Sequence, residues 1–255
     1  MSQLTSIRLI DGGRAIRDLI RRTAVAAGAT ALVLGASAGA AAASTAIPVS
    51  HLYWANNQAG TIVEANLNGT SAHVIASGQH GPQGVAVDAS HLYWANEAAG
   101  TIVEANLDGT SAHVIASSQA QPLGVAVDAS HLYWANLNAG TIVEAGLDGT
   151  GAHVIASGLF PAGVAVDASH LYWGNQGTVT IPGTIVEANL DGTGAKTIAS
   201  GKGSPHGVAV DASHLYWANA ITSTKGTILE ANLDGTGAKV IASRQNGPTG
   251  VAVGP

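Results

Sequence analysis

The chain has 255 residues, of which 46% are hydrophobic and 10% are charged, and it contains no cysteine. This composition supplies a sizeable core and excludes intrinsic disorder, disulfide crosslinks, thiol catalysis and the common Cys/His zinc sites. The net charge is −6, and residues 44–255 carry five Lys or Arg against fourteen Asp or Glu. Because an acidic body repels phosphate backbones, we expect no nucleic-acid partner.

Residues 1–43 are predicted to be a removable signal peptide. Arg21 and Arg22 precede an uncharged, Ala-rich stretch at 23–43 that ends in small residues suited to cleavage. The paired arginines resemble a twin-arginine signal, so both the Sec and the twin-arginine route are open. The alternative is a membrane anchor, because the stretch reaches the length of a short spanning helix. We expect a secreted or otherwise extracytoplasmic protein, with no membrane span in the mature form and one domain over residues 44–255.

The rest of the chain consists of five copies of one repeat, in which the tetrapeptide HLYW begins at residues 51, 91, 131, 170 and 214. Each copy contains four short segments rich in β-branched and aromatic residues, in the order GVAV, HLYWA, TIVEAN and HVIAS. Turn sequences separate these segments. The repeat therefore predicts an all-β fold, a five-bladed β-propeller of four-stranded antiparallel blades. The alternative is an open solenoid, but solenoids use shorter coils or helical repeats.

The two ends of the repeat array predict how the ring closes. A final GVAV, Gly250–Val253, has no HLYW after it, and the first HLYW is preceded only by a shortened segment at 46–49. We expect Val251–Val253 to pair with Leu52–Trp54 and complete the first blade, because this pairing removes an exposed edge from each end. Residues 46–49 are the alternative first strand, although Pro48 lacks the N–H that a full ladder needs.

The strings HLYWAN, ANLDGT and P-x-G-V-A-V-D resemble the YWTD repeat of low-density-lipoprotein-receptor-type (class B) propellers, over residues 46–255. The resemblance implies a bacterial-type, secreted version of this propeller and a non-enzymatic interaction module. Asn replaces the Asp of the family tetrad in every copy, at Asn56, Asn96, Asn136, Asn175 and Asn219. Since Asn keeps one acceptor and gains two donors, a hydrogen-bonding role between blades is still expected. No receptor ligand is carried over to this chain.

Polar and aromatic residues that recur in every copy are interpreted as structural. The five Trp of HLYW are expected to pack between neighbouring sheets. The Asp after GVAV is expected to accept N–H groups of the next turn; the alternative is a carboxylate ring that attracts a cation. The Glu of TIVEAN is expected to face solvent or bond across the blade. Eight of the ten His recur at fixed positions, so we predict no metal site and no cofactor.

The copies differ mainly in two stretches, one between the second and third strands and one between the fourth strand and the next GVAV. In an up-and-down blade these connections share one end, so the variation gathers on one face of the disc, here called the variable-loop face. Loops on a rigid scaffold commonly carry binding function, and Phe160 is the predicted apolar anchor. The predicted binding residues are His80, Gln121, Leu123, Phe160, Lys202, His206, Lys225 and Arg244.

These observations predict a binding or scaffold module for an extracytoplasmic protein, peptide or glycan, with no catalytic residues. The alternative is a propeller enzyme of the lyase or lactonase type, with its site at the channel mouth. Such an enzyme would need metal-binding carboxylates or a His and Glu pair that converges on the channel.

Overall fold

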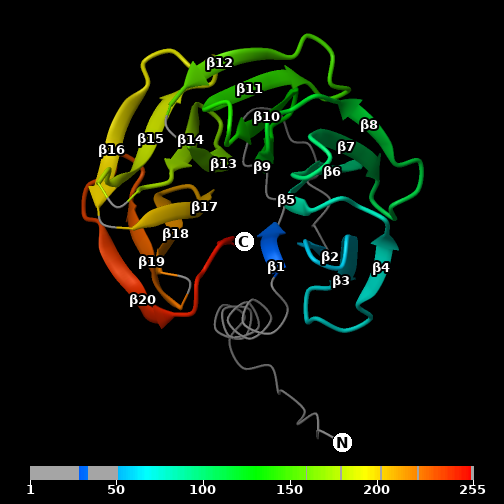
Figure 1. Cartoon of the computed structure of the whole chain (residues 1–255), viewed down its shortest axis with the longest axis horizontal. Helices are drawn as coiled ribbons and strands as arrows, with labels where there is room; N and C mark the ends of the chain where they lie inside the picture. The colour runs from blue at the N-terminus through cyan, green and yellow to red at the C-terminus, as the bar shows by residue number, and fades with distance from the viewer. Residues whose placement is uncertain are drawn as a thin grey trace, which may run out of the picture.

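A computed structural model describes residues 29–33, 51–158, 160–178, 180–201, 203–222 and 224–253. Its strands form five four-stranded antiparallel sheets, which are arranged as blades around a common axis (Figure 1). Within each blade the strands follow the order of the chain, and the first strand lies nearest the centre (Figure 1). The predicted five-bladed β-propeller is confirmed. No helix of the described residues is long and apolar enough to cross a bilayer.

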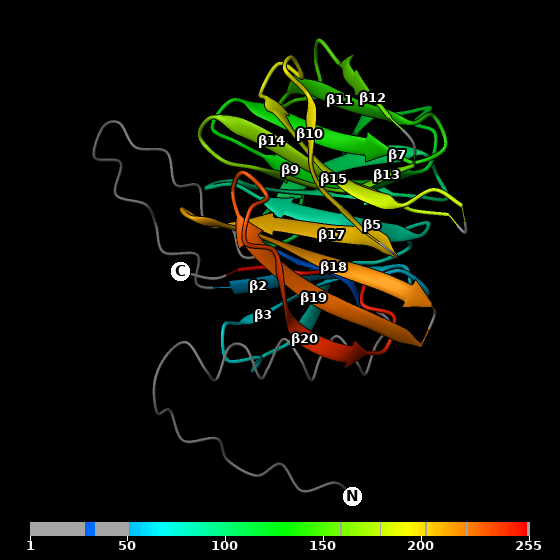
Figure 2. The same cartoon turned by 90° about the vertical axis from the view of Figure 1, so that its left-hand side faces the viewer.

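The five blades use closely similar strands. Blade 1 contains β1 (Ala29–Val33), β2 (His51–Asn56), β3 (Thr61–Asn66) and β4 (His73–Ala76). Blade 2 contains β5 (Pro82–Val87), β6 (His91–Asn96), β7 (Thr101–Asn106) and β8 (His113–Ala116). Blade 3 contains β9 (Pro122–Val127), β10 (His131–Asn136), β11 (Thr141–Gly146) and β12 (His153–Ser157). Blade 4 contains β13 (Pro161–Val166), β14 (His170–Asn175), β15 (Gly183–Asn189) and β16 (Lys196–Gly201). Blade 5 contains β17 (Ser204–Val210), β18 (His214–Thr222), β19 (Lys225–Asn232) and β20 (Lys239–Gln245), side by side in Figure 2.

The core consists of apolar clusters between successive blades. Side chains alternate across a strand, so Leu92 and Trp94 of β6 pack against blade 1, whereas Tyr93 and Ala95 pack against blade 3. The same pattern joins blades 3 and 4 and blades 4 and 5. Trp94 and Trp134 are fully buried, which confirms the packing role predicted for the repeated Trp. Among the described residues, no such cluster joins blade 5 to blade 1.

The inner strands contact one another backbone to backbone. A Cβ added to Gly84 would lie 2.4 Å from the carbonyl oxygen of Leu123, and one added to Gly163 would lie 2.1 Å from that of His206. Only glycine fits at such positions. Each described inner strand of blades 2 to 5 also has an irregular register beside this glycine. The residue between Pro and Gly is therefore carried on a bulge at the inner ring, where it can be aimed away from the ladder.

The first blade is completed by a strand from an unexpected part of the chain. β1 pairs with β2, with Leu32 opposite Trp54 and Val33 opposite Tyr53. This strand lies within the predicted signal peptide, whose bounds stay a prediction, and the alternative strand at 46–49 lies outside the described residues. The segment after β20 runs toward the centre of the ring (Figure 1). A Cβ on Gly207 would lie 2.8 Å from Gly250 Cα. Closure through Val251–Val253 therefore stays a prediction.

In blades 2 to 5, the turn between the first two strands satisfies its own polar groups. Asp128 Oδ1 accepts the backbone N–H groups of Ser130 and His131, each at 2.7 Å, and Oδ2 accepts the Tyr133 hydroxyl at 3.0 Å. Blades 2, 4 and 5 repeat this arrangement. The predicted turn role of these Asp residues is confirmed. Glu144 lies 3.4 Å from His131 and 3.8 Å from His153, so the repeated Glu bonds across the blade.

Candidate binding site on the variable-loop face

The two variable connections lie on the same face of the disc, as the backbone hydrogen bonds between them show. The backbone N–H of Glu97, after β6, donates to the carbonyl of Gly81, before β5, at 2.9 Å. In blade 3, Leu137 N–H donates to the Gln121 carbonyl at 3.0 Å, and in blade 4 Gln176 N–H donates to the Phe160 carbonyl at 2.9 Å. The shared face predicted from the repeat is therefore confirmed for these blades.

Three of the predicted binding residues have left-handed backbone conformations. Gln121 has a φ of 61° and Phe160 a φ of 52°, directly before the Pro of their inner strands. The matching residues after blades 1 and 5 are Gly81, with a φ of 68°, and Gly247, with a φ of 51°. Arg244 has a φ of 57°. Left-handed backbone disfavours side chains, so these three residues occupy conformations that suit glycine. Phe160 is nevertheless 42% exposed.

A carboxylate joins the loops of blades 2 and 3. Glu97, after β6, accepts hydrogen bonds from the side-chain amides of Gln83 and Gln121. Gln83 is carried on the bulge of β5, and Gln121 precedes β9. The three side chains therefore form one polar cluster near the inner ring, with Glu97 half-buried.

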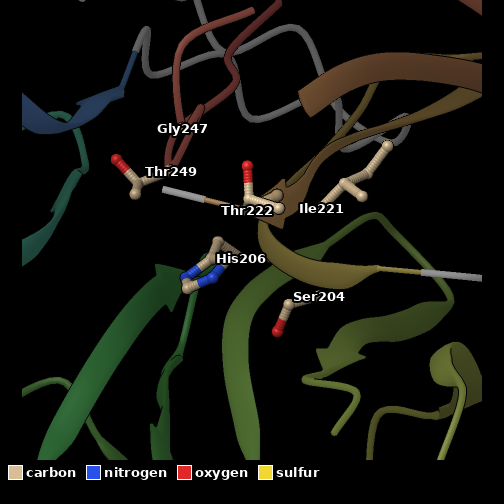
Figure 3. Close-up of a pocket in the computed structure, with 7 residues that line it drawn as sticks. Ser204, His206, Ile221, Thr222, Gly247 and Thr249 are labelled. Carbon is tan, nitrogen blue, oxygen red and sulfur yellow. The ribbon is translucent and has the colours of Figure 1, made fainter. Parts of the chain in front are cut away.

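A cavity of about 370 Å³ lies at the same face of blade 5 (Figure 3). Its lining includes Ser204, His206, Ile221, Thr222 and Thr249. Burial lowers the pKa of His206 below its ordinary value, so the neutral imidazole is favoured at neutral pH. The lining therefore offers hydroxyl and imidazole groups beside the apolar side chains of Ala220 and Ile221.

The side chain of Gln176 contacts the imidazole ring of His206. The side-chain nitrogen Nε2 of Gln176 lies 3.2 Å from His206 Nδ1. When the amide nitrogen donates in this contact, Nδ1 is the acceptor and the ring proton of the neutral imidazole resides on Nε2. This contact also connects the loop of blade 4 to the inner strand of blade 5.

The structure brings together only part of the predicted site. Gln121 joins the Glu97 cluster, and His206 joins the blade 5 cavity, whereas His80 is exposed and Leu123 is half-buried. Lys202 lies outside the described residues. Lys225 and Arg244 were expected in loops, but they lie in β19 and β20. The reason is that the β18–β19 hairpin continues its ladder, with Thr222 opposite Lys225, and β20 extends to Gln245.

Several functional candidates escaped the sequence interpretation. They are Gln83, Glu97, Gln176, Ser204, Thr222 and Thr249. The position between Pro and Gly was the available signal, because it is the one position of the inner-strand sequence that changes in every copy. It holds Gln83, Leu123, Ala162, His206 and Thr249.

One variable position has a structural role in two blades. Trp94 Nε1 and Asn96 Nδ2 both donate to Gln79 Oε1, each at 2.9 Å. Gln79 belongs to the connection that leaves blade 1, so these bonds link two blades. Blade 3 repeats the arrangement with Gln119. The hydrogen-bonding role between blades that was predicted for the Asn of YWAN is confirmed at these two positions.

No group of three or more His, Asp and Glu residues within the described ranges is arranged to hold a metal ion.

No protein-family model matches the chain, and no curated protein matches it. Among solved structures, it is similar to the nidogen/laminin complex, at 25% identity and a TM-score of 0.71, covering 80% of this chain and 82% of that chain. This similarity and the five blades support the resemblance to YWTD-type propellers.

Two propeller enzymes share the fold. A gluconolactonase from Xanthomonas campestris is 18% identical, with a TM-score of 0.63, and the match covers 79% of this chain and 74% of that chain. A streptogramin B lyase is 13% identical, with a TM-score of 0.65, covering 89% of this chain and 73% of that chain. At these identities the comparison shows the fold alone.

Proposed function

We propose that the chain is an exported propeller that binds a protein, peptide or glycan through its variable-loop face, without catalysis. The observation that carries this proposal is the left-handed backbone of Gln121, Phe160 and Arg244. Gly81 and Gly247 have the same conformation at the sites matching Gln121 and Phe160, so the loop folds without a side chain there. A non-glycine residue in this conformation costs about 1 kcal/mol. The side chains of Gln121, Phe160 and Arg244 therefore do not improve stability, and contact with a ligand is the role that this proposal gives them.

The solved structures support a binding role as one use of the fold. The similar structure at 25% identity is a complex of nidogen with laminin, so that protein takes part in a protein–protein contact. Export is supported by the arginine-led, Ala-rich segment at 23–43.

The test separates the side chains from the backbone that carries them. The double variant Phe160→Gly/Arg244→Gly removes both side chains while keeping the backbone conformation accessible. Ser111→Gly is the matched control, because Ser111 has a φ of 57° but lies in a turn of the opposite face. Wild type and variants are screened on a glycan array and a displayed peptide library.

We expect at least one ligand that Ser111→Gly retains and that the double variant binds at least about tenfold more weakly, which corresponds to about 1.4 kcal/mol. All three proteins should melt within a few degrees of one another. If every ligand binds the double variant as tightly as wild type, the variable-loop face is not the binding surface.

The second candidate is a propeller enzyme with its site at the channel mouth. One observation favours it: His206 is kept neutral in a cavity that also contains Ser204 and two threonines. A neutral imidazole can act as a general base. Stoichiometric divalent metal in the purified protein, found by mass spectrometry and removed by a chelator, would favour this candidate over the binding module.

The proposal includes ring closure by the C-terminal strand. This closure is supported by the position of Gly250, which lies against Gly207 as Gly207 lies against Gly163. Gln245 precedes its Pro by three residues, as Gln79 does, and its side-chain amide donates to the Ser243 carbonyl at 2.8 Å. Gln79 makes the equivalent bond to Ser77. The side chain of Gln245 is therefore oriented to accept hydrogen bonds from the Trp and Asn side chains of blade 1 when Gly250–Val253 takes the inner position.

A further inference from the structure

The acidic side chains of the propeller belong almost entirely to its repeated segments. All but one of the fourteen Asp and Glu of residues 44–255 lie in the strings VDAS, TIVEAN or TILEAN, and LDGT. The exception is Glu97, in the connection after β6 of blade 2. The variable connections of blades 4 and 5 therefore contain no carboxylate that would repel an anionic ligand.

Lys225 differs from the other lysines that the structure describes. Lys196 Nζ lies 3.3 Å from Glu187, and Lys239 Nζ lies 3.0 Å from Glu230. Within the described ranges, Lys225 forms no ion pair. It lies directly opposite Thr222 in the ladder of β18 and β19. Opposite side chains point to the same side of a sheet, with Cβ atoms about 5 Å apart. Since Thr222 lines the cavity of about 370 Å³, the Lys225 ammonium group is within reach of the cavity rim.

The cavity itself is lined by hydrogen-bond donors and by no carboxylate (Figure 3). Thr222 Oγ1 accepts the backbone N–H of Thr224 at 3.3 Å, so the hydroxyl hydrogen is available to a ligand. When Gln176 donates to His206 Nδ1, the imidazole supplies an N–H at Nε2. The polar side chains of the lining are those of Ser204, His206, Thr222 and Thr249. Three hydroxyls and one imidazole can therefore donate to a single acceptor group.

A carboxylate is the acceptor group that matches this lining. It accepts through two oxygens and donates nothing, and its charge is opposite to that of Lys225. The other side chains of the lining, Ala220 and Ile221, are apolar and can pack against a methylene stem. An acidic sugar would bring several further hydroxyls, which lose hydrogen bonds when they are buried against apolar side chains. The lining therefore favours an acidic amino-acid side chain.

We propose that this cavity binds the carboxylate of a Glu or Asp side chain in a partner polypeptide. The carboxylate oxygens accept from the Ser204 and Thr222 hydroxyls and from His206. Lys225 supplies the opposite charge at the rim, and Ile221 packs against the methylene stem. The inference deepens the proposed function and rests on it in one respect, that the partner is a polypeptide bound at the variable-loop face.

The test uses the full chain and a small probe. N-acetylglutamate methylamide is titrated into ¹⁵N-labelled protein at constant ionic strength, while the backbone N–H signals of Ser204, Thr222 and Thr249 are followed by NMR. We expect these signals to shift saturably. The neutral glutamine analogue should bind at least about tenfold more weakly, because it has no charge and only one acceptor oxygen.

Three results would overturn the proposal or its parts. Signals that do not shift saturably overturn the site. Equal affinity for the glutamine analogue overturns the assignment to a carboxylate. Tighter binding of glucuronate than of the glutamate probe overturns the assignment to a polypeptide.

Two variants with matched controls locate the probe. Lys225→Gln should lower the affinity about two- to fivefold, the size typical of an exposed ion pair. Lys239→Gln removes the same charge at the opposite end of the β19–β20 ladder and should bind the probe as wild type does. Thr222→Val should lower the affinity about tenfold, because a lining hydroxyl is lost. Its control is Thr224→Val, outside the lining. If each variant binds as its control does, the probe occupies another place.

The site and the proposed function can fail separately. Phe160 is not part of the lining, so Phe160→Gly should bind the probe as wild type does. A probe that binds in the cavity, beside a double variant Phe160→Gly/Arg244→Gly that retains every library ligand, would support this site and overturn the binding role of Phe160 and Arg244. Loss of library ligands in the double variant, beside cavity signals that do not respond to the probe, would overturn this site alone.

Discussion

Blades 2 and 3 differ from blade 5 in the residue that stands at the position of Gln79 and in the length of the hairpin between the second and third strands. In blade 3, Gln119 accepts from both Trp134 and Asn136, and the two variable connections are short. In blade 5, Lys202 stands at the position of the glutamine, and the hairpin of β18 and β19 is longer. Two cavities, of about 370 Å³ and about 270 Å³, lie beside blade 5.

The difference shows what a broken repeat does in a repeated fold. A residue that recurs in blades 2 to 5 finds its partner at the same place in each of them, as the turn Asp residues do. Where one copy has a different residue, that hydrogen bond cannot form in the same way. The changed copies therefore differ from the regular ones in their side-chain contacts.

The largest expected effect concerns the closure of the ring between blade 5 and blade 1. Deleting Gly250–Val253 from a chain that begins at Ser44 should lower the free energy of unfolding by more than about 4 kcal/mol, because blade 1 would lose its inner strand. Urea unfolding followed by Trp fluorescence measures this change. The same deletion in the full chain should cost much less, because β1 stays paired with β2. Equal losses in the two chains would contradict closure by the C-terminal strand.

The next largest effect is expected when blade 3 loses the side-chain acceptor of its Trp and Asn. Gln119→Ala should lower the free energy of unfolding by about 1 to 3 kcal/mol, because two buried donors, Trp134 Nε1 and Asn136 Nδ2, lose their acceptor. Chemical denaturation measures the loss. The control is Ser118→Gly in the same loop, which removes an exposed side chain from a residue with a φ of 59° and should not lower the free energy of unfolding. Similar losses for both variants would mean that the loop, and not the acceptor, determines stability.

The smallest expected effect is a pH dependence in blade 5. Burial lowers the pKa of His206 below its ordinary value of 6.5, so the unfolded chain binds a proton there more readily than the folded chain. The stability due to this group is fully present above pH 6.5 and is lost as the pH falls through the folded pKa.

The comparison of wild type with His206→Gln isolates this contribution. Denaturation at a series of pH values should show wild type losing stability relative to the variant below pH 6.5, while the nine remaining His affect both proteins alike. His80→Gln, in an exposed loop, is the control. Parallel pH curves for wild type and His206→Gln would show that the imidazole is not desolvated.

The repeated parts of the protein could be predicted from the amino-acid sequence alone. The spacing of HLYW predicted five blades, and the recurrence of its Trp predicted packing between neighbouring sheets. The Asp128 turn could be predicted for the same reason, since its partners Ser130 and His131 lie within three residues of it. Hydrogen-bond partners that are close in sequence and a fixed strand period can both be recognised without knowledge of the tertiary structure.

Which variable residues contact one another depends on how the blades are arranged in the tertiary structure. Glu97 with Gln121, Gln176 with His206 and the cavity beside Trp217 each join different blades, at separations that no sequence period encodes. The occupancy of blade 1 by Ala29–Val33 could not be predicted either, because any apolar extended segment can fill an open sheet edge. Contacts between blades depend on how the ring is assembled, and each blade's own sequence does not contain that information.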